Sequence, residues 1–232
     1  MAPQLTSVLA ALLLVVSVPA FLVSASDPDP LADFIIDGKT ATTATGADFT
    51  FRGLNKVTIP AGVGANAAVA APPALPGLKG QGLAYVYLSY APCGQIPPHT
   101  HPRATEILYV VSGQLYVGFV DSNNKLFDAT LNVGDVFVFP RGLVHFQQNF
   151  NQSQPAVALA AVNSENPGTQ FLARTMFGGG LPTNVVQVAL AQDAATVNKL
   201  VTGFPASGNA VGTPTTGCAA GNGTESRGRK LF

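Results

Sequence analysis

All three histidines of this 232-residue chain fall within two short blocks rich in glycine, proline and apolar residues. The first block runs from Gly94 to Gly113 and contains the spacing His-x-His-x4-Glu-x6-Gly. The second runs from Gly134 to Asn149 and contains Gly-x5-Pro-x-Gly-x2-His-x3-Asn. Because histidine occurs nowhere else, these blocks favour metal coordination, and the fold must bring them together.

Strand geometry predicts how the blocks meet. Side chains alternate faces along a β-strand, so His99 and His101 point the same way. Glu106 follows in the next strand or turn, and a turn at Gly113 folds the chain back so that a later strand can bring His145 opposite. Three imidazoles and one carboxylate leave open positions for water or a small substrate. This mixed ligand set suits Mn or Fe and could hold Zn, Ni or Cu.

The pattern of apolar residues predicts an all-β fold. Short strands at this spacing are typical of a sandwich or barrel. A hairpin is expected around Ser112–Gly113, and Ala61–Gly80 is interpreted as a loop or irregular edge. One strand is expected to begin at Phe49 and another to contain His145. The other expected strands cover residues 84–90, 106–111, 114–120, 126–131, 136–139 and 155–162.

A change of period near the C-terminus predicts a helix. Asp193 can cap it, and its apolar stripe can pack on the barrel, contact a neighbouring subunit, or do both. Residues 206–232 are expected to form a flexible tail. The stripe consists of Val197, Leu200, Val201 and Phe204.

The N-terminus has the features of an export signal. Leu9–Val23 is a nearly unbroken apolar run before a small-residue cleavage site ending at Ala25. The run is short for a bilayer span, so no membrane span is expected. Two glycosylation sequons, at Asn151 and Asn222, fit secretion. Net charge is zero and only 10% of residues are charged, so there is no electrostatic case for a nucleic-acid partner.

The chain has two cysteines, Cys93 and Cys218. A bridge between them is possible in an oxidising compartment. The alternative is a buried free Cys93 and an exposed Cys218 that could pair between chains. The Gly/Thr/Ala-rich composition around Cys218 slightly favours the absence of an intrachain bridge.

The two blocks resemble the motifs of the cupin superfamily, and within it those of the germins and germin-like proteins of plants. The segment from Pro97 to Glu106 is similar to a germin signature, and Ser26–Phe34 is similar to a germin mature N-terminus. The resemblance covers the chain from about Ser26 to Phe204. One departure is clear: germins carry two N-terminal cysteines that form a disulfide, and this chain has no cysteine before Cys93.

The resemblance implies a jelly-roll β-barrel with C-terminal helices that forms homo-oligomers, as hexamers built from three dimers. It implies secretion to the extracellular space, apoplast or cell wall. The expected organisation is a signal peptide (1–25), an N-terminal extension packed on the barrel (26–60), the barrel core (61–170), a helical segment (171–205) and the tail (206–232). Mn²⁺ is the expected ion, held by His99, His101, Glu106 and His145.

Three hypotheses for function follow from the resemblance. The first is superoxide dismutation by bound Mn, with Asn149 either supporting the ligands or making a strand-end hydrogen bond. The second is oxalate oxidation, for which germins place asparagines near the metal. Lys79 and Val86 stand at those places here, and valine cannot donate the required hydrogen bond, which disfavours oxalate. The third is a non-enzymatic wall, receptor or storage protein, although an intact ligand set argues against pure storage.

Overall fold

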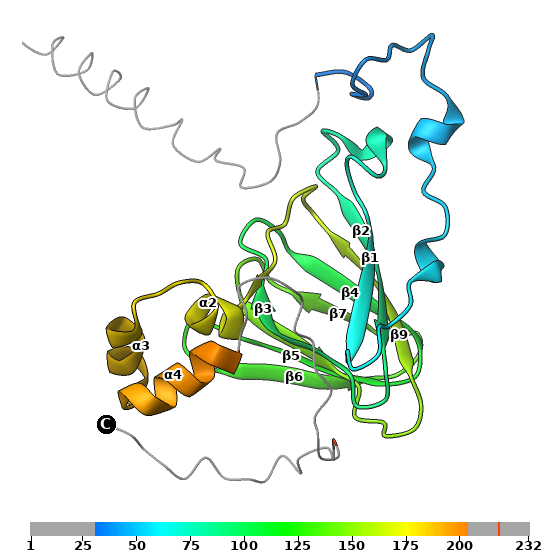
Figure 1. Ribbon diagram of the computed structural model, residues 1–232. Helices are drawn as coiled ribbons and strands as arrows, with labels where there is room; N and C mark the ends of the chain where they lie inside the picture. Colours follow the sequence, from blue (N-terminus) through cyan, green and yellow to red (C-terminus); the bar gives the residue numbers. More distant parts are fainter. Residues whose placement is uncertain (1–30, 204–217, 219–232) are drawn as a thin grey trace, which may run out of the picture.

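The computed structural model of the protein describes residues 31–203 and Cys218 (Figure 1). Its main body consists of two antiparallel sheets of five strands each. The first sheet has the order β1 (Ala65–Ala70), β2 (Ala84–Tyr90), β9 (Ala156–Val162), β4 (Glu106–Ser112) and β7 (Val136–Phe139). The second has the order β10 (Gln170–Phe171), β3 (Gln95–Thr100), β8 (Val144–Gln148), β5 (Leu115–Val120) and β6 (Leu126–Leu131). The predicted all-β class is confirmed.

The core lies between the sheets because every second side chain of each strand points inward. β9 is central in its sheet, and its inward positions are small: Ala156, Ala158 and Ala160 are buried. Larger side chains from neighbouring strands fill the space that these alanines leave. The largest apolar members of this core include Tyr90, Leu108, Leu115, Val117 and Phe139.

The hairpin expected around Ser112–Gly113 is wrong. β4 pairs with β7 and β9 in the first sheet, whereas β5 pairs with β6 and β8 in the second. The chain therefore crosses from one sheet to the other at Gly113. Gly113 has φ +76°, and a Cβ there would lie 2.7 Å from the Pro155 carbonyl oxygen, so only glycine fits this crossing without strain.

Two local predictions before β2 differ from the structure. The strand expected to begin at Phe49 is wrong, because Phe49 ends a 3₁₀ helix, η1 (Gly46–Phe49). Residues 61–80, expected to be a loop or irregular edge, contain the edge strand β1 and a 3₁₀ helix, η3 (Pro76–Leu78), so the loop alternative is wrong. β1 is an alanine-rich edge strand that pairs only with β2, so its sequence lacks the alternation of large apolar residues that marks a strand. A further 3₁₀ helix, η2 (Leu54–Lys56), contacts β1 and β2.

Three helices follow β10 and gather on one side of the barrel: α2 (Leu172–Phe177), α3 (Thr183–Leu190) and α4 (Ala194–Gly203) (Figure 1). The predicted cap of α4 is confirmed, because Asp193 Oδ1 accepts a 2.8 Å hydrogen bond from the Thr196 N–H. Val197 is fully buried where α4 packs on α2 and α3. Phe204 lies outside the described residues. No helix among residues 31–203 combines the length and apolar character needed to cross a bilayer.

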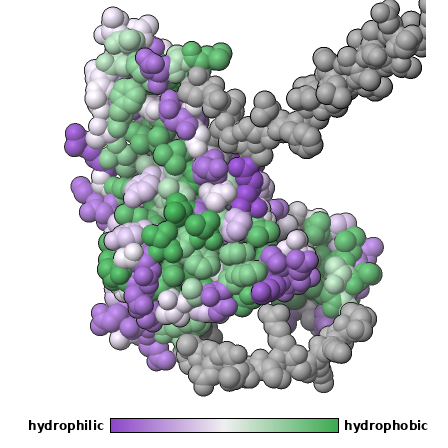
Figure 2. Space-filling model, turned by 180° about the vertical axis from the view of Figure 1, so that it is seen from behind, coloured by the Kyte–Doolittle hydropathy of each residue, from purple (hydrophilic) through white to green (hydrophobic). Residues whose placement is uncertain are grey.

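The outward face of the first sheet is apolar. Ile107 and Val138 lie opposite each other in the β4–β7 register, as do Tyr109 and Val136. These four side chains are 43–52% exposed, and Tyr85 on β2 is 39% exposed. Seen from behind, hydrophobic side chains gather in the middle of the barrel surface (Figure 2). An apolar surface of this kind on a folded chain marks a contact site.

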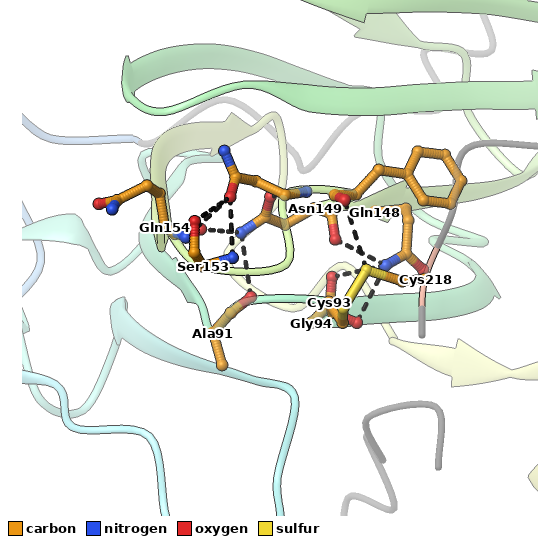
Figure 3. Close-up of a disulfide and its surroundings, with 10 residues drawn as sticks. Ala91, Cys93, Gly94, Gln148, Asn149, Ser153, Gln154 and Cys218 are labelled. Carbon is orange, nitrogen blue, oxygen red and sulfur yellow. Dashed lines mark hydrogen bonds between the residues drawn. A yellow bond between two sulfur atoms is a disulfide. The ribbon is translucent and has the colours of Figure 1, made fainter. Parts of the chain in front are cut away.

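The preference for unpaired cysteines is wrong, because Cys93 and Cys218 form a disulfide with a Cα–Cα distance of 5.3 Å (Figure 3). Cys93 lies in the turn between β2 and β3, where its carbonyl accepts a 3.0 Å hydrogen bond from Gln148 Nε2. Cys218 is 5% exposed and lies against the Phe150 carbonyl. The composition around Cys218 carries no signal for this long-range contact.

We expect Cys218→Ser to lower the free energy of unfolding by about 2–4 kcal/mol, because the bridge joins residues 125 apart and restricts the unfolded chain. Urea unfolding under non-reducing conditions measures the loss. Cys93→Ser should lose the same amount, and the double variant should lose no more than either single variant. A Cys218→Ser protein as stable as the oxidised wild type would contradict the bridge.

Candidate metal centre

The structure brings the four predicted ligands together at the meeting point of the two sheets. His99 on β3 lies opposite His145 on β8 in the register of the second sheet, and His101 follows the end of β3. Glu106 begins β4 in the first sheet. All four side chains are buried, with exposures of 1–7%. One ligand atom from each residue lies within 4.8 Å of the others.

Backbone carbonyls orient two of the imidazoles. Nδ1–H of His99 donates to the Pro97 carbonyl at 2.9 Å, and Nδ1–H of His145 donates to the Leu143 carbonyl at 2.9 Å. These bonds assign the proton to Nδ1 and leave the Nε2 lone pair facing the cluster. Nε2 of His145 is buried without a hydrogen-bond partner. It lies 3.5 Å from Glu106 Oε2.

His101 completes the set and approaches the same carboxylate oxygen as His145. Its Nε2 lies 3.0 Å from Glu106 Oε2, and its Nδ1 lies 3.4 Å from the Thr169 hydroxyl. Each of the three rings therefore has one nitrogen supported by the protein and the other directed at Glu106 or the space beside it. This is the usual arrangement of histidines that bind metals.

The protonation states also suit metal binding, which requires neutral imidazoles and an ionised carboxylate. Burial and the neighbouring His145 lower the pKa of His99 to about 3. Burial alone would raise the pKa of Glu106, but the neighbouring His101 and His145 outweigh it and lower that pKa to about 2. His99 is therefore neutral and Glu106 negative at neutral pH.

In the metal-free protein, we expect the free energy of unfolding to fall as the pH is lowered. Between pH 6.5 and about 3, unfolded His99 binds a proton that folded His99 does not. Between pH 4.5 and about 2, unfolded Glu106 likewise binds a proton before the folded carboxylate does. Urea unfolding at a series of pH values measures this loss of unfolding free energy. His99→Gln should reduce the loss that occurs above pH 4.5. Equal stability at pH 7 and pH 3 would contradict both shifts.

Two residues near Glu106 were not predicted from the sequence. Gln147 is 1% exposed, and its Nε2 donates to Glu106 Oε1 at 3.4 Å, on the opposite side of the carboxylate from the histidines. Tyr90 is fully buried, and burial together with the charge of Glu106 raises its pKa well above the ordinary value. Gln147 was detectable in the sequence, since it follows His145 by two positions and so shares its strand face.

A cavity of about 540 Å³ is lined by three of the candidate ligands, His99, His101 and Glu106, together with residues of β1, β2 and β9. Its wall is mainly aliphatic and includes Val86, and its polar side chains besides the ligands include Thr169 and Arg174. Lys79 does not line it, and pairs instead with Asp37. Of the two positions considered for oxalate recognition, only Val86 thus faces the cavity, and it offers no hydrogen bond.

Asn149 does not bond to the ligands. Its Nδ2 donates to the carbonyls of Ala91 (3.0 Å) and Gln154 (2.8 Å), and its Oδ1 accepts from the Asn151 N–H (Figure 3). These bonds tie together the turns at the strand ends, which favours the strand-end interpretation. The sequon residue Asn151 is exposed, whereas Asn222 lies outside the described residues.

A jelly-roll barrel that holds three histidines and one glutamate defines the cupin class, and the family model described as Cupin matches residues 54–198. The chain is 45% identical to Germin-like protein 8-10 of Oryza sativa subsp. japonica over 206 residues, covering 82% of this chain and 91% of that protein. It is 47% identical to Germin-like protein 8-8 of the same species, covering 75% and 83%. The chain belongs to the germin-like family of cupins.

A solved structure described as oxalate oxidase is similar in fold and sequence. The two superpose with a TM-score of 0.71 and 36% identity, over 77% of this chain and 98% of the other. The likeness therefore includes nearly all of the oxalate oxidase chain. It supports the jelly-roll assignment.

Proposed function

We propose that this chain is a secreted, manganese-binding germin-like protein that dismutates superoxide to hydrogen peroxide in the extracellular matrix. The observation that carries the proposal is the cluster of four buried side chains with their ligand atoms within 4.8 Å, three of which line a cavity. We place it in the apoplast and cell wall, with residues 1–25 as the signal peptide and Asn151 and Asn222 as glycosylation sites.

The residues present fit a metal ion. Nε2 of His145 is a buried acceptor with no hydrogen-bond partner, an arrangement that costs free energy unless a cation occupies the space in front of it. Three imidazoles and one carboxylate suit Mn or Fe, although Zn, Cu and Ni bind similar sets. The family supports Mn among these.

The reaction consumes two superoxide ions and two protons and yields one dioxygen and one hydrogen peroxide. A bound Mn ion would supply the electron transfer, because it can alternate between two oxidation states. The negative charge of Glu106 would favour the higher oxidation state, and Gln147 would hold the carboxylate in place through Oε1. The aliphatic wall would limit access to small molecules, and water entering the cavity would bring the protons.

His101→Ala should lower the superoxide rate constant of the Mn-loaded protein by at least about 100-fold, because it removes one ligand and one hydrogen bond to Glu106. Stopped-flow absorbance measures the decay, with metal-free protein and free Mn²⁺ at equal concentration as controls. Circular dichroism checks that the variant is folded. Wild-type decay no faster than that with free Mn²⁺ would contradict dismutation.

Oxalate oxidation is the second candidate, and the likeness to solved oxalate oxidase, one structure of which is described in complex with glycolate, favours it. The apolar Val86 in the cavity wall argues against it. Hydrogen peroxide formed from oxalate by the same Mn-loaded protein distinguishes the two activities. Turnover of neither substrate would favour a non-enzymatic wall, receptor or storage role.

We also propose that the chain forms homo-oligomers, with a hexamer as the expected state in this family. The apolar outer face of the first sheet supports this, because a second copy could cover Ile107, Tyr109, Val136 and Val138. The helices offer another candidate surface, since Val188 on α3 is 83% exposed. The two surfaces could serve different contacts.

Val138→Lys should shift the protein to a smaller assembly, because it places a charge in the middle of the sheet contact. Light scattering coupled to size-exclusion chromatography measures the mass. Val188→Lys is the matched variant for the helical surface and should leave the sheet contact intact. Unchanged mass for Val138→Lys would exclude this face from the oligomer interface.

A further inference from the structure

Arg174 of α2 contributes a positive charge to the wall of the metal cavity. Its guanidinium carbon lies 5.6 Å from the centroid of the Phe171 ring. Phe171 on β10 is opposite His99 on β3, and the two rings lie 5.4 Å apart. The guanidinium is therefore separated from a candidate metal ligand by one aromatic ring, and α2 lies beside β3 (Figure 1).

No carboxylate of the described part of the chain pairs with Arg174. Within residues 31–203, no Asp or Glu oxygen lies within 4.0 Å of its guanidinium nitrogens. Other cations of the described chain are engaged: Lys39 pairs with Asp48, and Lys79 pairs with Asp37. Arg103 donates to Asn166. Arg174 is half-buried, and its guanidinium donates no hydrogen bond to another residue of the described range 31–203. Its N–H groups can therefore donate to a bound molecule.

The apolar cavity lets the charge of Arg174 act over a longer distance than an exposed charge would. Its wall is mainly aliphatic, and among residues 31–203 the only carboxylate that lines it is Glu106. A divalent ion bound to Glu106 would leave one net positive charge at the ligands, and Arg174 adds another along the wall. Charges of one sign in a low-dielectric cavity concentrate ions of the opposite sign and are screened less than exposed charges.

We propose that Arg174 recruits a small anion to the metal centre and thereby determines the charge class of the substrate. This inference rests on the proposed metal site and specifies the substrate class of that site. Arginine is suited to the role because its planar donors fit oxyanions such as a carboxylate and its charge persists at every physiological pH. Superoxide and oxalate are both anions, so the proposal names the chemistry that they share.

The test is anion binding to the Mn-loaded protein, measured with azide as the probe by Mn²⁺ electron paramagnetic resonance. Arg174→Gln should weaken azide binding by about three- to tenfold and flatten its dependence on ionic strength. Arg174→Lys, which keeps the charge, should retain most of the affinity. Arg52→Gln removes the same charge from an exposed position outside the cavity and should have no effect. Metal analysis confirms equal Mn content before each titration.

A parallel titration with oxalate distinguishes the two sources of anion, and a loss of affinity for either anion in Arg174→Gln supports the inference. Equal affinities of wild type and Arg174→Gln for both anions, at equal Mn content, would overturn it. Loss of affinity in Arg174→Lys as large as in Arg174→Gln would also overturn it, because packing on Phe171 rather than charge would then be responsible.

The outcome is separable from the proposed function. A wild type that binds azide through Arg174 but does not accelerate superoxide decay would contradict the proposed dismutation and support the inference. A wild type that dismutates superoxide, with Arg174→Gln unchanged in rate and in affinity for both azide and oxalate, would support dismutation and overturn the inference.

Discussion

The carboxylate of Glu106 is the interaction on which the rest of this structure depends, because it joins the two sheets through polar contacts inside an apolar barrel. Glu106 belongs to the first sheet, whereas His145 and Gln147 lie on β8 of the second and His101 follows β3. A buried carboxylate without partners would destabilise the fold. The histidines that lower its pKa to about 2 are the same groups that can bind a metal with it. Stability and metal binding thus share one set of contacts.

The apolar surroundings give the cluster its chemical character. Burial keeps His99 neutral, so the imidazole is available as a ligand over the physiological range. The aliphatic wall leaves few polar groups to contact a substrate, and Arg174 is the cation among them. In such a site, net charge and size select the substrate more than specific hydrogen bonds do. A site of this kind suits a small anion that reacts by electron transfer.

The sequence predicted the site better than it predicted the connections between strands. The ligand blocks are local patterns, and strand alternation was enough to place His99 and His101 on one face. The path of the chain at Gly113 depends on how two sheets close around a core, and a glycine between two strands gives the same signal for a hairpin and for a crossing. β1 was missed because its alanines form an edge that needs no large apolar side chain. The partner of Cys93 was 125 residues away, beyond any local pattern.

The central claim is that His99, His101, Glu106 and His145 hold one manganese ion. Anomalous X-ray scattering at the manganese absorption edge, from crystals of the Mn-loaded protein, tests it most directly. The account predicts a single anomalous peak per chain, within about 2.0–2.3 Å of the three Nε2 atoms and one Glu106 oxygen. A peak elsewhere, or an empty cluster in crystals grown with excess Mn²⁺, would contradict it.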